Sequence, residues 1–151
     1  HHLMNQIARG EKNAQDITKY FQRYDSLYHV NDIMMHFTSN HDENSWNGTE
    51  FERLGEGART FAVLTYTVPG MPLMYSGQEQ AMNKRLKFFD KDTIPWKDFP
   101  YADFYTTLNN LKHTNSAIWN GEKGGKYTLV NNNTPKAVCS FVRQKTNTKY
   151  W

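Results

Sequence analysis

The side chains with the richest chemistry in the sequence lie in one short segment, residues 40–44, which read Asn-His-Asp-Glu-Asn. An asparagine amide donates and accepts hydrogen bonds, an imidazole donates one or two, and an ionised aspartate accepts two from neighbouring hydroxyls. These groups suit a ligand that is rich in hydroxyls. Trp46 follows closely, and its ring offers a flat apolar face for stacking. The candidate ligand-binding residues are therefore Asn40, His41, Asp42, Asn44 and Trp46.

Two other interpretations of residues 40–44 follow from the same side chains. A polar loop after a strand often serves only as a solvated turn or as the N-cap of the next helix. His41, Asp42 and Glu43 are also potential metal ligands. However, consecutive residues rarely converge on one ion, and no H-x-x-x-H or similar ligand spacing is present. We expect no metal site here, whereas the choice between a turn and a ligand contact stays open on these residues alone.

Two short apolar runs, residues 33–37 and 72–75, each lead into a polar segment, 40–44 and 76–79 respectively. Such runs are typical of strands buried on both faces of a parallel sheet. Helical spacing over residues 50–67 places one helix between them, and a strand–helix–strand order implies parallel pairing. Functional loops follow the carboxyl ends of parallel strands, which lie about 4.8 Å apart. The two polar segments are therefore expected to share a pocket.

Further helices and a hairpin are predicted on either side of this unit. Apolar residues recur at helical spacing over residues 13–28 and again over 101–115, while residues 80–100 are irregular. After Gly124-Gly125 the apolar period changes to two, which predicts a β-hairpin through residues 127–141. We therefore divide the chain into an α/β part, residues 1–120, and the start of an all-β domain, residues 121–151.

Composition and charge exclude several classes of partner. The chain has 151 residues and a formal net charge of +3, and its Lys and Arg residues form no extended run. Nucleic-acid binding normally needs a clustered basic face, so we expect no nucleic-acid partner. No apolar segment approaches the roughly 18 residues of a membrane span, so we expect no such span.

Three segments resemble one enzyme family, the α-amylase superfamily (glycoside hydrolase family 13). Residues 37–42, Phe-Thr-Ser-Asn-His-Asp, are similar to its F-x-x-N-H-D segment at the seventh barrel strand. Residues 70–79 resemble its G-x-P-x-x-x-x-G-x-E segment at the eighth strand, and residues 88–96 its following F-x-x-x-x-x-I-x-W stretch. The resemblance implies an α/β fold: the C-terminal part of a (β/α)8 TIM barrel, with the last two strands and their helices, followed by an antiparallel β segment.

The resemblance also implies roles for individual residues. Asp42 would be a catalytic-site carboxylate that binds the 2- and 3-hydroxyls of the sugar at the cleavage point, and His41 would bind the same sugar. Asn40 would support the strand end. Glu79 would be structural, holding the barrel mouth by hydrogen bonds. Gly70 and Gly77 would serve backbone conformation.

The catalytic machinery implied by the resemblance extends beyond these residues. A retaining glycosidase needs a nucleophile and a general acid about 5 to 5.5 Å apart. In the family these come from the fourth and fifth strands, and the G-x-R-x-D pattern of the nucleophile is not found here. A complete barrel also needs roughly 250 residues. We therefore expect a fragment that is inactive alone and needs the remainder of the parent barrel as its partner.

For the parent, the resemblance implies retaining hydrolysis of α-1,4-glucosidic bonds in starch-like α-glucans or maltooligosaccharides. No cofactor is expected in this segment, although a calcium ion is possible in the rest of the parent. Polymeric substrates favour an extracytoplasmic site of action. The alternatives are a non-enzymatic glucan-binding or structural relative on the same fold, and a transglycosylase or isomerase of the same superfamily.

Overall fold

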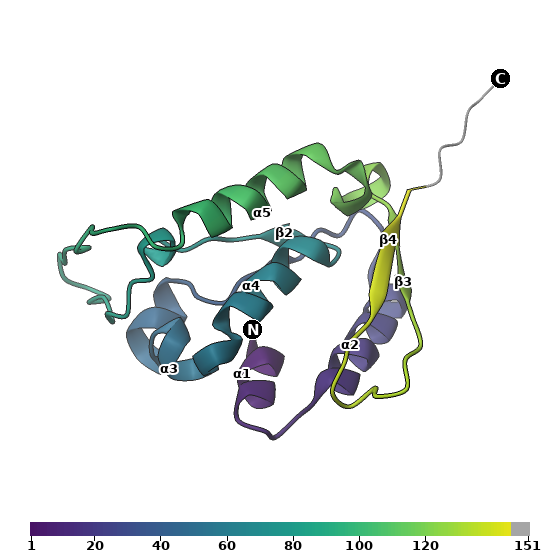
Figure 1. The fold of residues 1–151 in the computed structure, drawn as a ribbon, viewed down its shortest axis with the longest axis horizontal. Coiled ribbons are helices and arrows are strands. Elements are labelled where there is room, and N and C mark those ends of the chain that lie inside the picture. Colours follow the sequence, from purple (N-terminus) through teal and green to yellow (C-terminus); the bar gives the residue numbers. More distant parts are fainter. Residues whose placement is uncertain (146–151) are drawn as a thin grey trace.

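The structure is a computed structural model that describes residues 1–145, so residues 146–151 of the predicted all-β segment lie outside the described residues. Helices lie around a two-stranded parallel sheet, and a two-stranded antiparallel hairpin lies at one edge of the molecule, beside one of these helices (Figure 1). The helices are α1 (His2–Ala8), α2 (Ala14–Leu27), α3 (Glu50–Leu54), α4 (Ala58–Thr67) and α5 (Ala102–Thr114). The strands are β1 (Met35–His36), β2 (Met71–Pro72), β3 (Lys126–Leu129) and β4 (Phe141–Gln144). Short helical turns are η1 (Glu43–Asn47), η2 (Gly55–Gly57), η3 (Gln78–Gln80), η4 (Ser116–Ile118) and η5 (Gly121–Lys123).

The predicted parallel pairing of the two apolar runs is confirmed. β1 and β2 pair with Met35 opposite Met71 and His36 opposite Pro72. The prediction of strands buried on both faces is wrong for the described chain, because Ile33, Met35 and Met71 are exposed. Each strand pairs here on one edge only. On the face that carries Met35 and Met71 the side chains meet solvent, whereas His36 and Pro72 are half-buried.

The sequence fixes the start of α2 and the face that it buries. Asn13 and Asp16 form a reciprocal capping box that satisfies free N–H groups at the helix start. Ile17, Phe21 and Tyr24 follow at helical spacing and are buried. The helix predicted over residues 13–28 is therefore confirmed.

The helix predicted over residues 50–67 is interrupted. A capping box between Thr49 and Glu52 starts α3, which ends at Leu54. Gly55 then takes a positive φ of 52°, and the chain tightens into the turn η2 before α4 begins at Ala58. A residue without a Cβ adopts this conformation without steric cost, which is why the break falls at a glycine.

Two apolar clusters join the helices to one another and to the hairpin. α5, which confirms the helix predicted over 101–115, joins α4 through Ala62, Tyr66, Tyr105 and Leu108. The hairpin packs against α2, where the rings of Tyr127 and Phe21 lie 4.9 Å apart, and Figure 1 shows the two side by side. The described part of the hairpin therefore shares a core with α2, and the domain boundary at residue 120 stays a prediction.

The hairpin itself is antiparallel, as predicted, but its second strand begins later than expected. Leu129 pairs with Phe141, and the ladder runs to Lys126 and Gln144. Residues 137–139 do not join it, because the amides of Ala137 and Val138 bond to the carbonyl of Thr134 in a turn. The alternation of apolar residues that predicted the strand therefore extends into a turn, which local hydrogen bonds stabilise.

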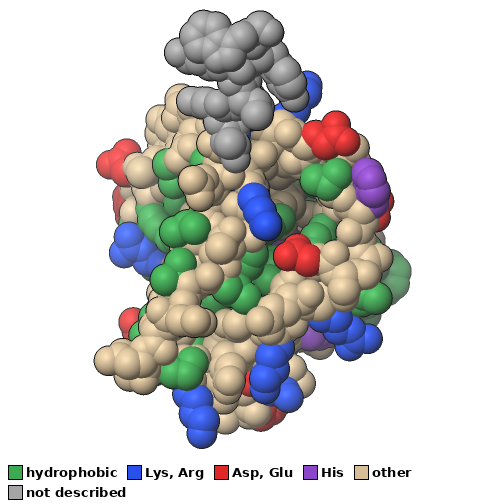
Figure 2. Space-filling view, turned by 90° about the vertical axis from the view of Figure 1, so that its right-hand side faces the viewer, with side chains coloured by type: hydrophobic (Ala, Val, Ile, Leu, Met, Phe, Trp, Pro, Cys, Tyr) green, Lys and Arg blue, Asp and Glu red, His purple; other side chains and the backbone are tan. Residues whose placement is uncertain are grey.

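Figure 2 views the molecule from the side that carries the hairpin. Basic and acidic side chains are interspersed over this face rather than gathered by sign. Hydrophobic side chains also reach the surface on this face. Val130, Val138 and Val142 of the hairpin segment are exposed. Among the helices of residues 1–145, none is long and apolar enough to cross a membrane.

Gly70 provides a test of the β1–β2 packing. Its φ is 129°, and a Cβ would lie 2.5 Å from the Met34 carbonyl oxygen and 2.6 Å from the His36 ring. We predict that Gly70→Ala lowers the free energy of unfolding by about 2–4 kcal/mol, because backbone strain and steric overlap add. Urea denaturation measures the change.

Gly10→Ala is the matched control. Gly10 also has a positive φ, 75°, but a Cβ there meets nothing within 4 Å. Gly10→Ala should lower the free energy of unfolding only by the cost of backbone strain, about 1 kcal/mol. Equal losses in the two variants would show that the close approach at Gly70 contributes nothing.

Candidate functional site

The chain leaves β1 through a polar segment that passes from the interior to the surface. Thr38 and Ser39 are buried, whereas the side chains of His41 and Asp42 are 67% and 57% exposed. Nε2 of His41 lies 3.6 Å from Oδ2 of Asp42. The two side chains predicted to bind hydroxyls are therefore adjacent, and both are accessible to a ligand from solvent.

Asn40 caps the turn that follows. Its Oδ1 accepts a hydrogen bond of 2.8 Å from the amide of Glu43, and its carbonyl accepts one of 2.9 Å from the amide of Asn44. These bonds hold the start of η1 in place. Asn40 thus caps η1. The supporting role at the strand end that the resemblance implies for it stays a prediction.

Asn44 is not exposed to a ligand, which corrects its assignment as a substrate-binding residue. Only 3% of it is accessible, and both ends of its amide are used. Oδ1 accepts from the amide of Leu86 at 2.7 Å, and Nδ2 donates to the carbonyl of Lys84 at 3.1 Å. Ser45 adds a bond of 2.7 Å from its hydroxyl to the Leu86 carbonyl. Asn44 therefore clamps residues 84–86 onto η1.

Trp46 is exposed, as a stacking residue must be, and two phenylalanine rings lie beside it. Its ring centroid lies 5.3 Å from that of Phe88 and 6.1 Å from that of Phe89. Phe88 in turn stacks on His41 at 5.8 Å with an interplanar angle of 26°. We call His41, Trp46, Phe88 and Phe89 the aromatic cluster. Its two phenylalanines were not predicted as site residues, although a Phe-Phe pair within a polar, irregular stretch was a visible signal.

The two strand ends meet, as predicted, but the residue that joins them is Gln78. Its Nε2 lies 2.9 Å from Oγ1 of Thr38, 2.6 Å from Oε2 of Glu50 and 3.1 Å from the phenol oxygen of Tyr105. Thr38 also donates to Glu50 at 2.8 Å. We call Thr38, Glu50, Gln78 and Tyr105 the buried polar network. Sequence reasoning missed it, because its members come from four separate elements.

Burial perturbs the titration of this network. Glu50 is 4% exposed, and its burial raises the pKa of the carboxyl group, although hydrogen bonds from Thr38 and Gln78 and the charge of Arg53 act in the opposite direction. Burial, and secondarily the charge of Glu50, raises the pKa of Tyr105 far above its usual range. The phenol therefore stays protonated.

Arg53 connects the network to its surroundings. Its guanidinium donates to the carbonyls of Thr38 at 2.7 Å and Gly48 at 2.8 Å, and to Oδ1 of Asn5 at 3.0 Å. Oε2 of Glu43 lies 3.5 Å away. One arginine thus joins α1, the exit of β1, η1 and α3, and it was not predicted from the sequence.

The remaining predicted residues lie at the second strand end. Gly77 has a φ of 91°, and a Cβ there would lie 3.0 Å from Met82, so both Gly77 and Gly70 serve backbone conformation as expected. The carbonyl of Glu79 accepts from the amide of Tyr101 at 3.0 Å. Its Oε2 is buried and has no hydrogen-bond partner within residues 1–145. The structural role predicted for the Glu79 carboxylate stays a prediction.

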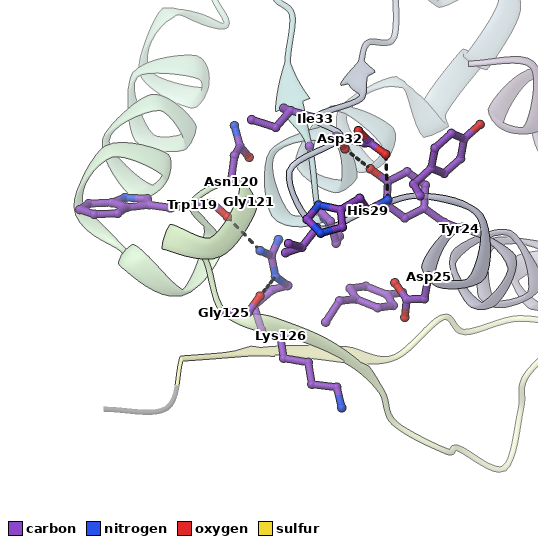
Figure 3. Close-up of a pocket in the computed structure, with 16 residues that line it drawn as sticks. Tyr24, Asp25, His29, Asp32, Ile33, Trp119, Asn120, Gly121, Gly125 and Lys126 are labelled. Atoms are coloured by element: carbon purple, nitrogen blue, oxygen red, sulfur yellow. Dashed lines mark hydrogen bonds between the residues drawn. The ribbon is translucent and has the colours of Figure 1, made fainter. Parts of the chain in front are cut away.

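A separate cavity of about 270 Å³ lies at the opposite ends of the strands (Figure 3). Ile33, which precedes β1, and Gly70, which precedes β2, both line it. Several polar groups around it already have partners: Arg143 donates to the carbonyls of Trp119 and Gly125, and the amide of His29 donates to Asp32. The cavity shares no lining residue with the site at Asp42, which follows the other end of β1.

Metal ligands do not gather in the described chain. No group of three or more His, Cys, Asp or Glu side chains within residues 1–145 is arranged to hold a metal ion. His36, the histidine within β1, has its Nε2 2.9 Å from the Pro69 carbonyl, and burial lowers the pKa of its ring. His36 is therefore a half-buried histidine with its hydrogen bond satisfied.

Solved structures of α-amylases share this fold over nearly the whole chain. A noncanonic maltogenic α-amylase from Thermotoga neapolitana matches with a TM-score of 0.75 and 22% sequence identity, over 90% of this chain and 31% of that one. An α-amylase from Lactobacillus plantarum matches with a TM-score of 0.72 and 18% identity, over 94% of this chain and 32% of its own.

The α-amylase from H. orenii matches with a TM-score of 0.66 and 18% identity, over 97% of this chain and 35% of that one. No protein-family model and no curated protein sequence matches the chain. The chain thus has the fold of part of an α-amylase and spans about a third of the length of these structures.

The raised pKa of Glu50 predicts a specific pH dependence. A carboxyl group with a higher pKa in the folded state binds its proton more tightly there. The contribution of Glu50 to the free energy of unfolding is therefore largest below pH 4.5, the ordinary pKa of the group. This contribution is lost as pH rises through the pKa of the folded state. We predict that Glu50→Gln removes this loss of stability. The free energy of unfolding of the variant minus that of the wild type should therefore grow from about pH 4 to about pH 8.

Urea unfolding across this pH range measures the difference. Glu56→Gln, which changes an exposed glutamate in η2, controls for the loss of one negative charge. A difference curve for Glu50→Gln as flat as that control would rule out a burial cost at Glu50.

Proposed function

We propose that the chain is part of an α-amylase-type glycoside hydrolase, with β1 and β2 as the seventh and eighth strands of a (β/α)8 barrel. The parallel register of the two strands, with α3 and α4 between them, supports this position. The motif at residues 37–42 follows β1 and that at residues 70–79 spans β2, in the family's order. The fold shared with α-amylases from three organisms points the same way.

The observation that carries the proposal is the exposed pair His41 and Asp42 at the carboxyl end of β1. Active sites of such barrels lie at this end of the strands. Asp42 accepts hydrogen bonds from two neighbouring hydroxyls of the sugar at the cleavage point. These bonds tighten as the ring flattens toward an oxocarbenium-like state, so they lower the barrier more than they strengthen substrate binding.

The proposed substrate is an α-1,4-linked glucan or a maltooligosaccharide, cleaved with retention of configuration. The nucleophile and the general acid, about 5 to 5.5 Å apart, would come from the fourth and fifth strands of the barrel. Residues of this chain bind and orient the sugar from one side of the cleft. Any calcium ion would be held by other parts of the barrel.

A second candidate is a glucan-binding protein without hydrolytic activity. The exposed aromatic side chains Trp46, Phe88 and Phe89 favour it, because stacking binds sugars without any chemistry. Product analysis after incubation of the native polypeptide with maltohexaose separates the candidates. Shorter oligosaccharides indicate hydrolysis, longer ones transfer, and unchanged maltohexaose a binding protein.

The test of Asp42 is an Asp42→Asn substitution in the native polypeptide that contains this chain. We predict that kcat on maltohexaose falls by on the order of 10²–10³-fold while KM changes little, because the lost bonds are strongest in the transition state. Steady-state kinetics measure both constants.

Asp25→Asn is the matched control, because Asp25 is an exposed aspartate on α2 that lines the cavity at the opposite ends of the strands. It should leave kcat near the wild-type value. Near-normal hydrolysis by Asp42→Asn would refute the proposed role.

A further inference from the structure

We propose that Phe88 and Phe89, together with Trp46, form a stacking platform for one sugar ring of an α-glucan beside Asp42. This inference rests on the proposed function and deepens it, because it assigns part of the substrate specificity to the segment between β2 and α5. In Figure 1 that segment projects from the body of the molecule at the end away from the hairpin.

The first support is the exposure of these rings. Phe89 is 83% exposed, Trp46 59% and Phe88 38%. The rings of Phe88 and Phe89 lie 4.8 Å apart, edge to face, and both contact Trp46. A contiguous group of exposed aromatic side chains is unusual on a folded protein and marks a place where something apolar binds.

The second support is the polar group at the edge of the cluster. His41 stacks on Phe88 and also lies beside Asp42. A purely apolar partner laid over this surface would strip water from the Asp42 carboxylate without replacing it. A sugar ring has an apolar face of C–H groups and a rim of hydroxyls, so it satisfies the rings and the carboxylate together. The adjoining chemistry therefore selects a carbohydrate.

The third support is the way in which the platform is held. Asn44 and Ser45 bond to the backbone of Lys84 and Leu86. Nζ of Lys84 bonds to Asp92 at 2.6 Å, and the other Asp92 oxygen accepts from the amide of Lys87 at 3.0 Å. The hydrogen bond from Lys84 is the largest of the effects that keep the pKa of Asp92 well below its usual range.

These bonds close the segment on both sides of Phe88 and Phe89. Rings that are already ordered lose less conformational entropy when a ligand binds. Asn44 is therefore a positioning residue: it touches no sugar, but it holds the segment that does. The same side chain fixes the platform to the turn that follows Asp42.

The test is a kinetic and binding comparison in the native polypeptide, with maltohexaose as the probe. Phe89→Ala should raise KM, and Kd by calorimetry, by about 3- to 10-fold, the usual range for one aromatic contact, with kcat nearly unchanged. Phe89→Trp, which keeps a ring, should restore wild-type values. Tyr20→Ala, at an exposed aromatic residue on α2, should change neither constant.

Asn44→Ala tests the positioning role. It should raise KM as Phe89→Ala does, and the double variant should raise KM no further than either single change, because both remove the same contact. Additive effects on KM would show that Asn44 acts through some other part of the molecule.

The outcomes separate the two proposals. If Phe89→Ala lowers the melting temperature but leaves Kd and KM unchanged, the rings are covered by protein and the platform is refuted, while the role of Asp42 stands. If the wild-type polypeptide neither binds nor cleaves maltohexaose, the proposed function fails and the platform fails with it.

Discussion

The arrangement of the strand ends depends on the burial of one carboxylate, that of Glu50. A buried ionised group is costly unless hydrogen bonds and an opposite charge compensate it. Thr38 and Gln78 supply the hydrogen bonds, and Arg53 supplies the charge. Because Thr38 follows β1, Gln78 follows β2 and Arg53 lies on α3, satisfying Glu50 fixes these three elements relative to one another.

Polar contacts, more than apolar packing, connect the buried polar network to the surface. Arg53 holds the carbonyl of Thr38, Asn40 caps the next turn, and Asn44 attaches the segment that carries the aromatic cluster. His41 and Asp42 lie between these anchors and are themselves free to face a ligand. The site is thus hydrogen-bonded where it is buried and exposed where chemistry is proposed.

Local patterns predicted much of the fold, and residues that act at long range account for the failures. Helical spacing and the cap at Asn13 gave α2, because a helix is stabilised by near neighbours. Strand length and burial failed at Ile33 and Met35, because they depend on which strands and helices lie alongside. Asn44 was misassigned because its partners lie at Lys84 and Leu86, and no local pattern links such positions.

The bond between Lys84 and Asp92 closes a small loop, and no residue within it belongs to the buried polar network at the strand ends. The ends of this small loop are pinned, and the cost of closing a loop rises only slowly with its length. Substitutions or insertions between Lys87 and Asp92 are therefore expected to leave the packing of the strands and helices intact. In evolutionary terms, the ligand preference proposed for this loop is free to drift without any change to the turn that holds Asp42, because the two lie in separate stretches of one chain.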